Sequence, residues 1–192
     1  MTAIRKSSLA DTHPEIAAQA DGWDPTTVIG GNHKQFLWKC SVGHSWSASL
    51  TNRTNIGSNC PICANKQVLP GYNDLATTHP EIAKEADGWD PRTVTRSTSR
   101  KLSWRCPRGH QYNSPVSQRS NGSGCPICVG RTVLAGFNDL QTTDPHLAIQ
   151  AFGWDPTTVI AGTNKKFEWK CSFGHTWDAA PNTRNNGFGC PV

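Results

Sequence analysis

Apolar residues recur at every second position along two short stretches of the chain, residues 36–40 and 46–50. This period-2 pattern is typical of half-buried β-strands. The residues between the two stretches, Ser41-Val-Gly-His44, are few and include a glycine, which suits a tight turn. The pattern therefore predicts a β-hairpin whose tip carries Cys40 and His44.

A second pattern, with a helical period, is clearest at residues 78–88. Residues 78–81 read Thr-His-Pro-Glu, the form of a capping box with a proline in the first turn. Apolar residues follow on one face up to residue 86, and Gly88 suits a C-terminal stop. Residues 12–22 repeat the pattern, and residues 143–146 keep its Thr and Pro without the Glu. We therefore expect a helix of about two turns in each place.

Both patterns belong to a unit that occurs three times. Cys40, Cys106 and Cys171 are 66 and 65 residues apart, and three Gly-Trp-Asp-Pro motifs keep the same spacing. Tyr72-Asn-Asp-Leu recurs as Phe137-Asn-Asp-Leu after 65 residues. Several motifs with one shared period indicate internal repetition. We assign repeat 1 to residues 1–66, repeat 2 to 67–131 and repeat 3 to 132–192, the last truncated before its final ligand.

Composition changes the view of what holds each repeat together. Leu, Ile, Val and Phe make up only 33 of 192 residues, whereas the chain has eight Cys and eight Trp. A unit of about 65 residues with so few aliphatic residues usually needs a cross-link, such as a disulfide or a bound metal, to be stable. We find no apolar run long enough to span a bilayer and no secretory signal. We therefore expect a cytoplasmic protein, in which cysteines are more often metal ligands than disulfides.

The cysteines and three of the histidines have the spacing of zinc ligands. In repeats 1 and 2 a Cys-x3-His pair is followed, after a loop, by Cys-Pro-Ile-Cys, so that two short-spaced pairs can surround one tetrahedral Zn²⁺. A saturated site of three Cys and one His keeps no open position, which predicts structural rather than catalytic zinc. The predicted ligands are Cys40, His44, Cys60 and Cys63; Cys106, His110, Cys125 and Cys128; and Cys171, His175 and Cys190.

The third set lacks one ligand, and we expect its site to be weak or empty. Other uses of the cysteines fit less well. Disulfides would not need a His at a fixed offset, a redox Cys-x2-Cys lacks its βαβ context, and iron suits this donor set less than zinc does. The predicted fold class is a small, metal-stabilised α+β fold: three tandem zinc-finger units, each a β-hairpin knuckle plus a short helix.

These residues resemble a known family. Trp104-Arg-Cys106-Pro-Arg-Gly-His110, Arg119 and Gly-Ser-Gly-Cys125-Pro-Ile-Cys128 look like the tandem "probable zinc-ribbon" family, also described as a treble-clef zinc finger of unknown function. The resemblance covers nearly the whole chain. It implies a multi-finger array that is at times joined to a nuclease domain similar to very-short-patch-repair endonucleases, and this chain contains no such domain. Treble clef and simple ribbon stay open at this point, because the choice depends on whether Cys60-Pro-Ile-Cys63 opens a helix.

Charge is unevenly distributed. Segments 25–66, 91–131 and 156–192, which carry the predicted ligands, hold 16 of the 19 basic residues and two of the fourteen acids. Segment 91–131 has eight basic residues and no acid. A basic face on a zinc finger is the footprint expected for phosphate. The candidate nucleic-acid contacts are Lys34, Arg53, Arg96, Arg100, Lys101, Arg108, Arg119, Lys165, Lys166 and Arg184.

Three of these candidates have an alternative role. Arg53, Arg119 and Arg184 recur thirteen residues after the first cysteine of each repeat, in what we take to be a polar loop. They could equally brace their own finger. The tryptophans are expected to pack around the hairpin rather than to stack on bases.

We therefore expect a tandem structural-zinc module that binds nucleic acid, with DNA preferred because of the nuclease association that the resemblance implies. The alternatives are a protein–protein interaction module and the targeting part of a larger nuclease, with a protein or nuclease domain as partner. We expect no enzyme activity, because no nucleophile, base or paired carboxylates stand at a recognisable spacing.

Overall fold

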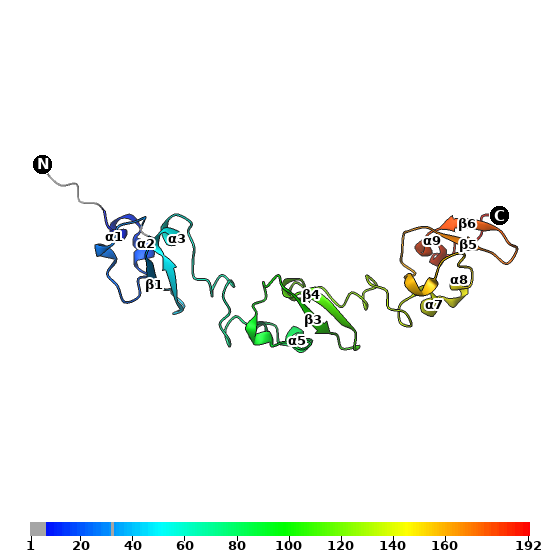
Figure 1. The fold of residues 1–192 in the computed structure, drawn as a ribbon, viewed down its shortest axis with the longest axis horizontal. Coiled ribbons are helices and arrows are strands. Elements are labelled where there is room, and N and C mark those ends of the chain that lie inside the picture. The colour runs from blue at the N-terminus through cyan, green and yellow to red at the C-terminus, as the bar shows by residue number, and fades with distance from the viewer. Residues whose placement is uncertain (1–6, 32) are drawn as a thin grey trace. The chain divides into compact units, whose positions relative to one another are not determined.

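A computed structural model describes residues 7–31 and 33–192, and there the three repeats share one order of elements. Each has two one-turn α-helices, a 3-10 turn, a hairpin and a further short helix (Figure 1). Repeat 1 comprises α1 (Leu9–Thr12), α2 (Pro14–Ala17), η1 (Pro25–Thr27), β1 (Gln35–Lys39), β2 (Ser45–Ser49) and α3 (Leu50–Thr54). Repeat 2 comprises α4 (Leu75–Thr78), α5 (Pro80–Ala83), η2 (Pro91–Thr93), β3 (Lys101–Arg105), β4 (Gln111–Pro115) and α6 (Val116–Ser120). Repeat 3 comprises α7 (Leu140–Thr143), α8 (Pro145–Ala148), η3 (Pro156–Thr158), β5 (Phe167–Lys170), β6 (Thr176–Ala179) and α9 (Pro181–Asn185).

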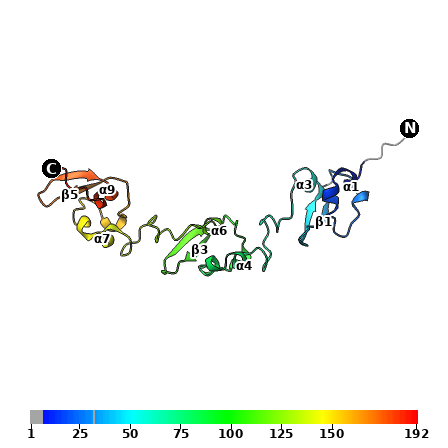
Figure 2. The same ribbon diagram turned by 180° about the vertical axis from the view of Figure 1, so that it is seen from behind.

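The predicted hairpin is present in each repeat as a two-stranded antiparallel sheet. In repeat 1 the register places Trp38 opposite Trp46, and in repeat 3 it places Trp169 opposite Trp177. Trp38 and Trp169 are fully buried. Helix α3 adjoins the hairpin of its own repeat in both views (Figures 1 and 2). The large aromatics thus form the centre of the small core, as expected.

The predicted two-turn helices begin at the wrong residue. The structure has two consecutive single turns, and the threonine that we expected to cap is the last residue of the first turn. His79, which precedes α5, makes no side-chain cap. The cap lies four residues earlier than expected, where the Asp74 carboxylate accepts from the Thr77 N–H at 2.9 Å. A carboxylate is a good acceptor for the free N–H groups of a first turn, so Asp74 starts the helix and Pro80 restarts it.

The Gly-Trp-Asp-Pro motif ties the segment before the hairpin to the hairpin itself. Trp23 Nε1 donates to the Leu37 carbonyl at 2.6 Å, and Trp89 and Trp154 make the same bond to Ser103 and Glu168. The aspartate of the motif caps the 3-10 turn that follows it. The motif is therefore a structural turn.

By its internal packing the chain divides into two compact units. One contains the part up to Ser103 with Ser114–Asn121, and the other contains Trp104–Asn113 with Gly122–Val192. The repeat boundaries at 66/67 and 131/132 stay a prediction. Across the described residues, no helix combines the length and the apolar character that crossing a bilayer requires.

Candidate metal centres

The first metal cluster joins the tip of the β1–β2 hairpin to the turn after α3. Cys40 and His44 flank the tip, where the Cys40 N–H donates to the His44 carbonyl at 3.0 Å. The tip turns through Gly43, whose φ of 97° is a conformation that side chains other than glycine rarely adopt. Cys60 and Cys63 come from a second tight turn, in which the Ala64 N–H donates to the Cys60 carbonyl. All four ligand atoms lie within 4.8 Å of one another.

The separations between these atoms fit a tetrahedral zinc ion. With Zn–S near 2.3 Å and Zn–N near 2.05 Å, the edges of a tetrahedron are about 3.8 Å between sulfurs and about 3.6 Å between sulfur and nitrogen. The observed Cys40 Sγ–Cys63 Sγ distance is 3.8 Å, and the Cys40 Sγ–His44 Nδ1 distance is 3.6 Å. The remaining Sγ–Nδ1 distances, from His44 to Cys63 and to Cys60, are 3.3 and 3.8 Å. Zinc bound here would link the hairpin to the following turn and stabilise a repeat with few aliphatic residues.

The second cluster has the same geometry. Cys106 Sγ lies 3.8 Å from Cys128 Sγ and 3.5 Å from His110 Nδ1, and Cys125 Sγ lies 3.8 Å from that nitrogen. The third cluster contains three predicted ligands, with Cys190 Sγ 3.6 Å from His175 Nδ1. Among the described residues no fourth Cys, His, Asp or Glu joins this third group. All eleven predicted ligands are therefore placed in three clusters, two complete and one with three members.

The thiols of the first cluster are arranged to need a cation. Burial raises the pKa of the Cys40 thiol, but hydrogen bonds from the backbone N–H groups of His44 and Val42 and from the neighbouring thiols outweigh it and lower the pKa to about 6. Desolvation raises the pKa of Cys63, and its hydrogen bonds with Cys60 and Cys40 and the negative charges on those two sulfurs act in the same direction, so that the pKa reaches about 11. One thiol would thus keep its proton beside a thiolate. A divalent cation removes this conflict, because it allows every thiol of the site to ionise.

The comparison with protein families agrees with this geometry. A family model described as a probable treble clef zinc finger domain matches residues 17–66, 81–131 and 152–192, which together exceed half of the chain. The chain belongs to this treble clef zinc finger family. No curated protein matches the chain. Each treble clef repeat contains one of the three clusters, and the three matched segments confirm the tandem arrangement.

The second cysteine pair of each complete treble clef repeat does not open a helix. Residues 60–66 form a series of turns, in which the Asn65 N–H donates to the Ile62 carbonyl and the Lys66 N–H to the Pro61 carbonyl. Asn65 has a positive φ of 55°, which ends any helical continuation. The helical part of the repeat lies instead before the hairpin and directly after it, so the treble clef assignment rests on the family match and not on a helix at the second cysteine pair.

The expectation that Arg53, Arg119 and Arg184 contact phosphate is wrong for this structure. All three are buried, with 2%, 6% and 5% of their surface exposed. They lie on α3, α6 and α9 and not in a polar loop. The first helical residue of each, Leu50, Val116 or Pro181, and the arginine three positions later both face the core. The alternative, that each arginine braces its own repeat, is the correct one.

The buried arginines of repeats 1 and 3 are each held by two tryptophan rings and by polar partners. The Arg53 guanidinium carbon lies 5.0 Å from the Trp38 ring centre and 5.3 Å from that of Trp46. Its Nη2 donates to Gln19 at 2.7 Å, and its Nη1 donates to the Ser58 carbonyl. Burial lowers the pKa of Arg53, while the charge on Cys60 acts in the opposite direction. With zinc bound, three thiolates around one Zn²⁺ would leave a net negative charge that compensates this cation in the core.

Repeat 3 uses the same arrangement as repeat 1, and in repeat 2 the polar partner is a carboxylate. Arg119 forms an ion pair with Glu85 at 2.6 Å, and their side chains are 8% and 19% exposed. Arg184 donates to Gln150 at 2.5 Å and lies 5.1 and 5.0 Å from the ring centres of Trp169 and Trp177. An ion pair in repeat 2 therefore replaces the Arg–Gln pairs of repeats 1 and 3.

The Asn-Asp-Leu motif has a role that the sequence reasoning missed. Asn73 is 4% exposed, and its Nδ2 donates to the carbonyls of Ile62 and Gln67 at 2.8 and 2.9 Å, while its Oδ1 accepts from the Leu69 N–H. The ring of Tyr72 contacts the His44 ring edge-on, with centres 4.4 Å apart. The start of one repeat is thus attached to the metal cluster of the repeat before it.

Asn138 and Phe137 make the same contacts to the second cluster. Asn138 donates to the Ile127 and Thr132 carbonyls, and the Phe137 ring lies 4.3 Å from that of His110. The sequence carries a signal for this contact, because the motif recurs with the repeat period and begins nine residues after the last cysteine of each Cys-x2-Cys.

Asp74 completes this junction. It is fully buried, and it accepts hydrogen bonds from the Thr77 hydroxyl and from the N–H groups of Thr77 and Gly71. Burial raises the pKa of Asp74, but these hydrogen bonds outweigh it and hold the pKa below its ordinary value. A carboxylate therefore sits at the start of α4, where it satisfies N–H groups that lack helical partners.

The remaining candidate nucleic-acid contacts lie on the surface. Lys34 and Lys165 extend over the rings of Phe36 and Phe167, at 5.7 and 5.3 Å from the ring centres. The seven exposed candidates are Lys34, Arg96, Arg100, Lys101, Arg108, Lys165 and Lys166.

Proposed function

We propose that this treble clef array is a structural-zinc module that binds nucleic acid, in the first place DNA. The observation that carries the proposal is the unbalanced charge of segment 91–131, which has no acidic residue. In the described structure several of its exposed cations have no side-chain partner, neither an ion pair nor a hydrogen bond. These residues are Arg92, Arg96, Arg100, Lys101, Arg108 and Arg131.

Unpaired surface cations are what phosphate recognition requires. Lys and Arg displace condensed counterions from the nucleic-acid backbone, and this release drives binding at low salt. The contrast with Lys84 is informative, because that exposed lysine contacts Glu81 at 2.6 Å and is already neutralised. DNA is preferred to RNA because the family resemblance implies arrays joined to DNA-cleaving domains.

The proposal is one of binding and not of catalysis. Zinc surrounded by three Cys and one His keeps no position for a substrate. The metal would hold the hairpin in shape, and the basic surface would supply the contacts. Tandem repeats on one strand of nucleic acid would then raise the affinity through their effective concentration.

A fluorescence anisotropy titration of the zinc-loaded chain tests this proposal. The probes are a labelled mixed-sequence DNA duplex of about 20 base pairs and the matching RNA duplex, at 50 and 200 mM salt. We expect DNA binding that weakens with salt, by a slope of about −0.9 per phosphate contacted. Arg100→Ala/Lys101→Ala should lower both the affinity and the slope, and Lys84→Ala, the control, should change neither. A chain that binds neither probe at 50 mM salt, or whose slope is unchanged in the double variant, refutes the proposal.

A further inference from the structure

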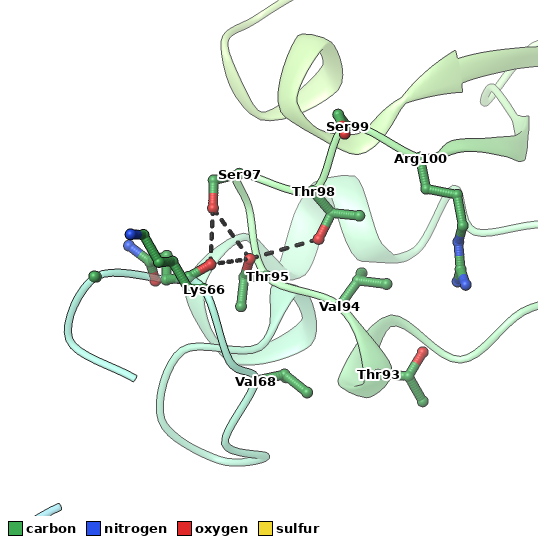
Figure 3. Close-up of a pocket in the computed structure, with 11 residues that line it drawn as sticks. Lys66, Val68, Thr93, Val94, Thr95, Ser97, Thr98, Ser99 and Arg100 are labelled. Atoms are coloured by element: carbon green, nitrogen blue, oxygen red, sulfur yellow. Dashed lines mark hydrogen bonds between the residues drawn. The ribbon is translucent and has the colours of Figure 1, made fainter. Parts of the chain in front are cut away.

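The turn after the first metal cluster and the segment before β3 line an open groove of ≈ 670 Å³. Five of its eleven lining residues, all between positions 93 and 99, carry a hydroxyl group. Lys66 and Arg100 are its two cations, and none of the lining residues is acidic. In Figure 3 the two cations stand on either side of the hydroxyl-bearing residues. A groove with this lining suits an anion and not an apolar ligand.

The groove is held in shape by hydrogen bonds that converge on one carbonyl. Asn65, in its left-handed conformation, presents its carbonyl oxygen to the Thr95 hydroxyl at 2.9 Å and to the Ser97 hydroxyl at 3.0 Å. Thr95 is 5% exposed, and its hydroxyl also lies 3.5 Å from that of Thr98 (Figure 3). The two walls are thus fixed to each other before any ligand binds. A site that is already ordered loses less entropy on binding.

The polar groups at the edge of the groove are not used inside the protein. Within residues 7–31 and 33–192, the side chains of Lys66, Arg100 and Ser99 have no hydrogen-bond or ion-pair partner, and all three are exposed. Two cations beside a free hydroxyl are the side-chain types that contact phosphate oxygens of nucleic acids. We propose that this groove binds phosphate groups of a nucleic-acid backbone, which rests on the function proposed above and gives it a specific site.

The other repeats lack the residues that build this groove. Positions 95–97 read Thr-Arg-Ser, whereas the equivalent positions 29–31 read Ile-Gly-Gly and 160–162 read Ile-Ala-Gly. The hydroxyls that bond the Asn65 carbonyl are therefore specific to repeat 2. The cations do have equivalents at the next junction, where Arg131 corresponds to Lys66 and Lys165 to Arg100. The chain thus contains its own control, with the same charges and without the Thr95 and Ser97 hydroxyls.

The experiment compares two double variants of the full, zinc-loaded chain. Lys66→Ala/Arg100→Ala removes both cations of the groove, and Arg131→Ala/Lys165→Ala removes two charges at the equivalent positions. Affinity for the labelled DNA duplex is measured by anisotropy between 50 and 200 mM salt. Zinc content and far-ultraviolet circular dichroism are checked for each variant, because all four side chains are exposed and their removal should leave the fold intact.

We expect the groove variant to lose about fivefold in affinity per cation, or about 25-fold in all, and to lower the salt slope by about 1.8. The control variant should lose less than about fivefold, with its slope lowered by less than about 0.9. Equal losses in the two variants would overturn the groove and leave nucleic-acid binding in place. No binding by the unaltered chain would overturn both proposals.

A second variant separates the hydroxyls from the charges. Thr95→Ile/Ser97→Gly installs the residues that repeat 3 has at these positions. We expect weaker DNA binding with an unchanged salt slope, because the walls lose the hydrogen bonds that fix them while both cations remain. Unchanged affinity would contradict a role for the hydroxyl wall. Inorganic phosphate at constant ionic strength is the last probe, and displacement of DNA by micromolar phosphate would identify a small-anion site and overturn the backbone proposal.

Discussion

Removal of the buried arginine of repeat 2 should destabilise that repeat by breaking a largely buried ion pair. Arg119 and Glu85 lie 2.6 Å apart, with side chains 8% and 19% exposed. Removal of one partner from a buried pair costs about 3–5 kcal/mol, because the other charge is left without compensation. Glu85 retains some access to water, so we expect Arg119→Met to cost about 3 kcal/mol, at the lower end. Methionine is chosen because its unbranched, uncharged side chain fills most of the space of the arginine stem.

The matched control comes from the other repeats, which use Gln19 and Gln150 in place of Glu85. Glu85→Gln converts the ion pair into the pairing that repeats 1 and 3 already have, and it should cost only about 1 kcal/mol. The double variant should then be more stable than the sum of the two single losses predicts, because it leaves no unpaired buried charge. The difference between the loss in the double variant and the sum of the two single losses measures the interaction energy of the ion pair.

Hydrogen exchange followed by mass spectrometry is the suitable assay, because a chain of several repeats does not unfold in one two-state step. Peptides from β3 and β4 should exchange roughly 100-fold faster in Arg119→Met, while those from β1 and β2 stay unchanged. A loss below about 1 kcal/mol in Arg119→Met, or an equal loss in Glu85→Gln, would refute the reasoning. DNA affinity measured while the variant is folded should be unchanged, since the guanidinium is buried.

Three further predictions follow from the metal clusters and the junction behind them. Zinc titrated into the metal-free chain should fill two tight sites before a weaker third, and three equal sites would contradict this. Lowering the pH from 7 to 5 should release zinc, since protons compete for thiolates that bind metal only when ionised; stability is therefore present at the higher pH and lost as the pH falls. Asn73→Ala should cost about 2 kcal/mol and speed exchange in residues 60–67, because the buried Ile62 carbonyl and the part-buried Gln67 carbonyl lose their donor. Asn138→Ala should affect only residues 125–132, and a shared effect would contradict separate junctions.

Much of the metal site could be predicted from spacing alone. A hairpin tip with Cys40 and His44, followed by Cys60-Pro-Ile-Cys63, leaves few ways to arrange four donors, and zinc geometry selects one of them. The hairpin itself was also predictable, because alternating aromatic residues have only one side on which to be buried. Local rules suffice where the residues involved are close in sequence or share a metal.

Prediction was wrong where two local patterns competed. Thr78-His-Pro-Glu81 has the form of a capping box. In the structure, however, the helix that Asp74 caps begins at Leu75 and ends at Thr78. A carboxylate that accepts from three donors competes better for the helix start than a threonine hydroxyl does. The sequence does not show which of the two residues caps the helix, because that depends on how Gly71 and Thr77 are placed around the Asp74 carboxylate.

The sequence by itself determined the three repeats, the hairpins, the ligands of each cluster and the excess of positive charge, because each of these depends on periodicity or composition. Only the tertiary structure decided what individual cations do. Arg53 and Arg100 are both basic residues in polar stretches, yet one is enclosed by two tryptophan rings and the other faces water in a groove. Burial decides between these roles, since a cation inside the core needs partners of its own while an exposed one is available to a ligand. Burial arises from packing between residues far apart in the chain, and for that reason no local pattern predicted it.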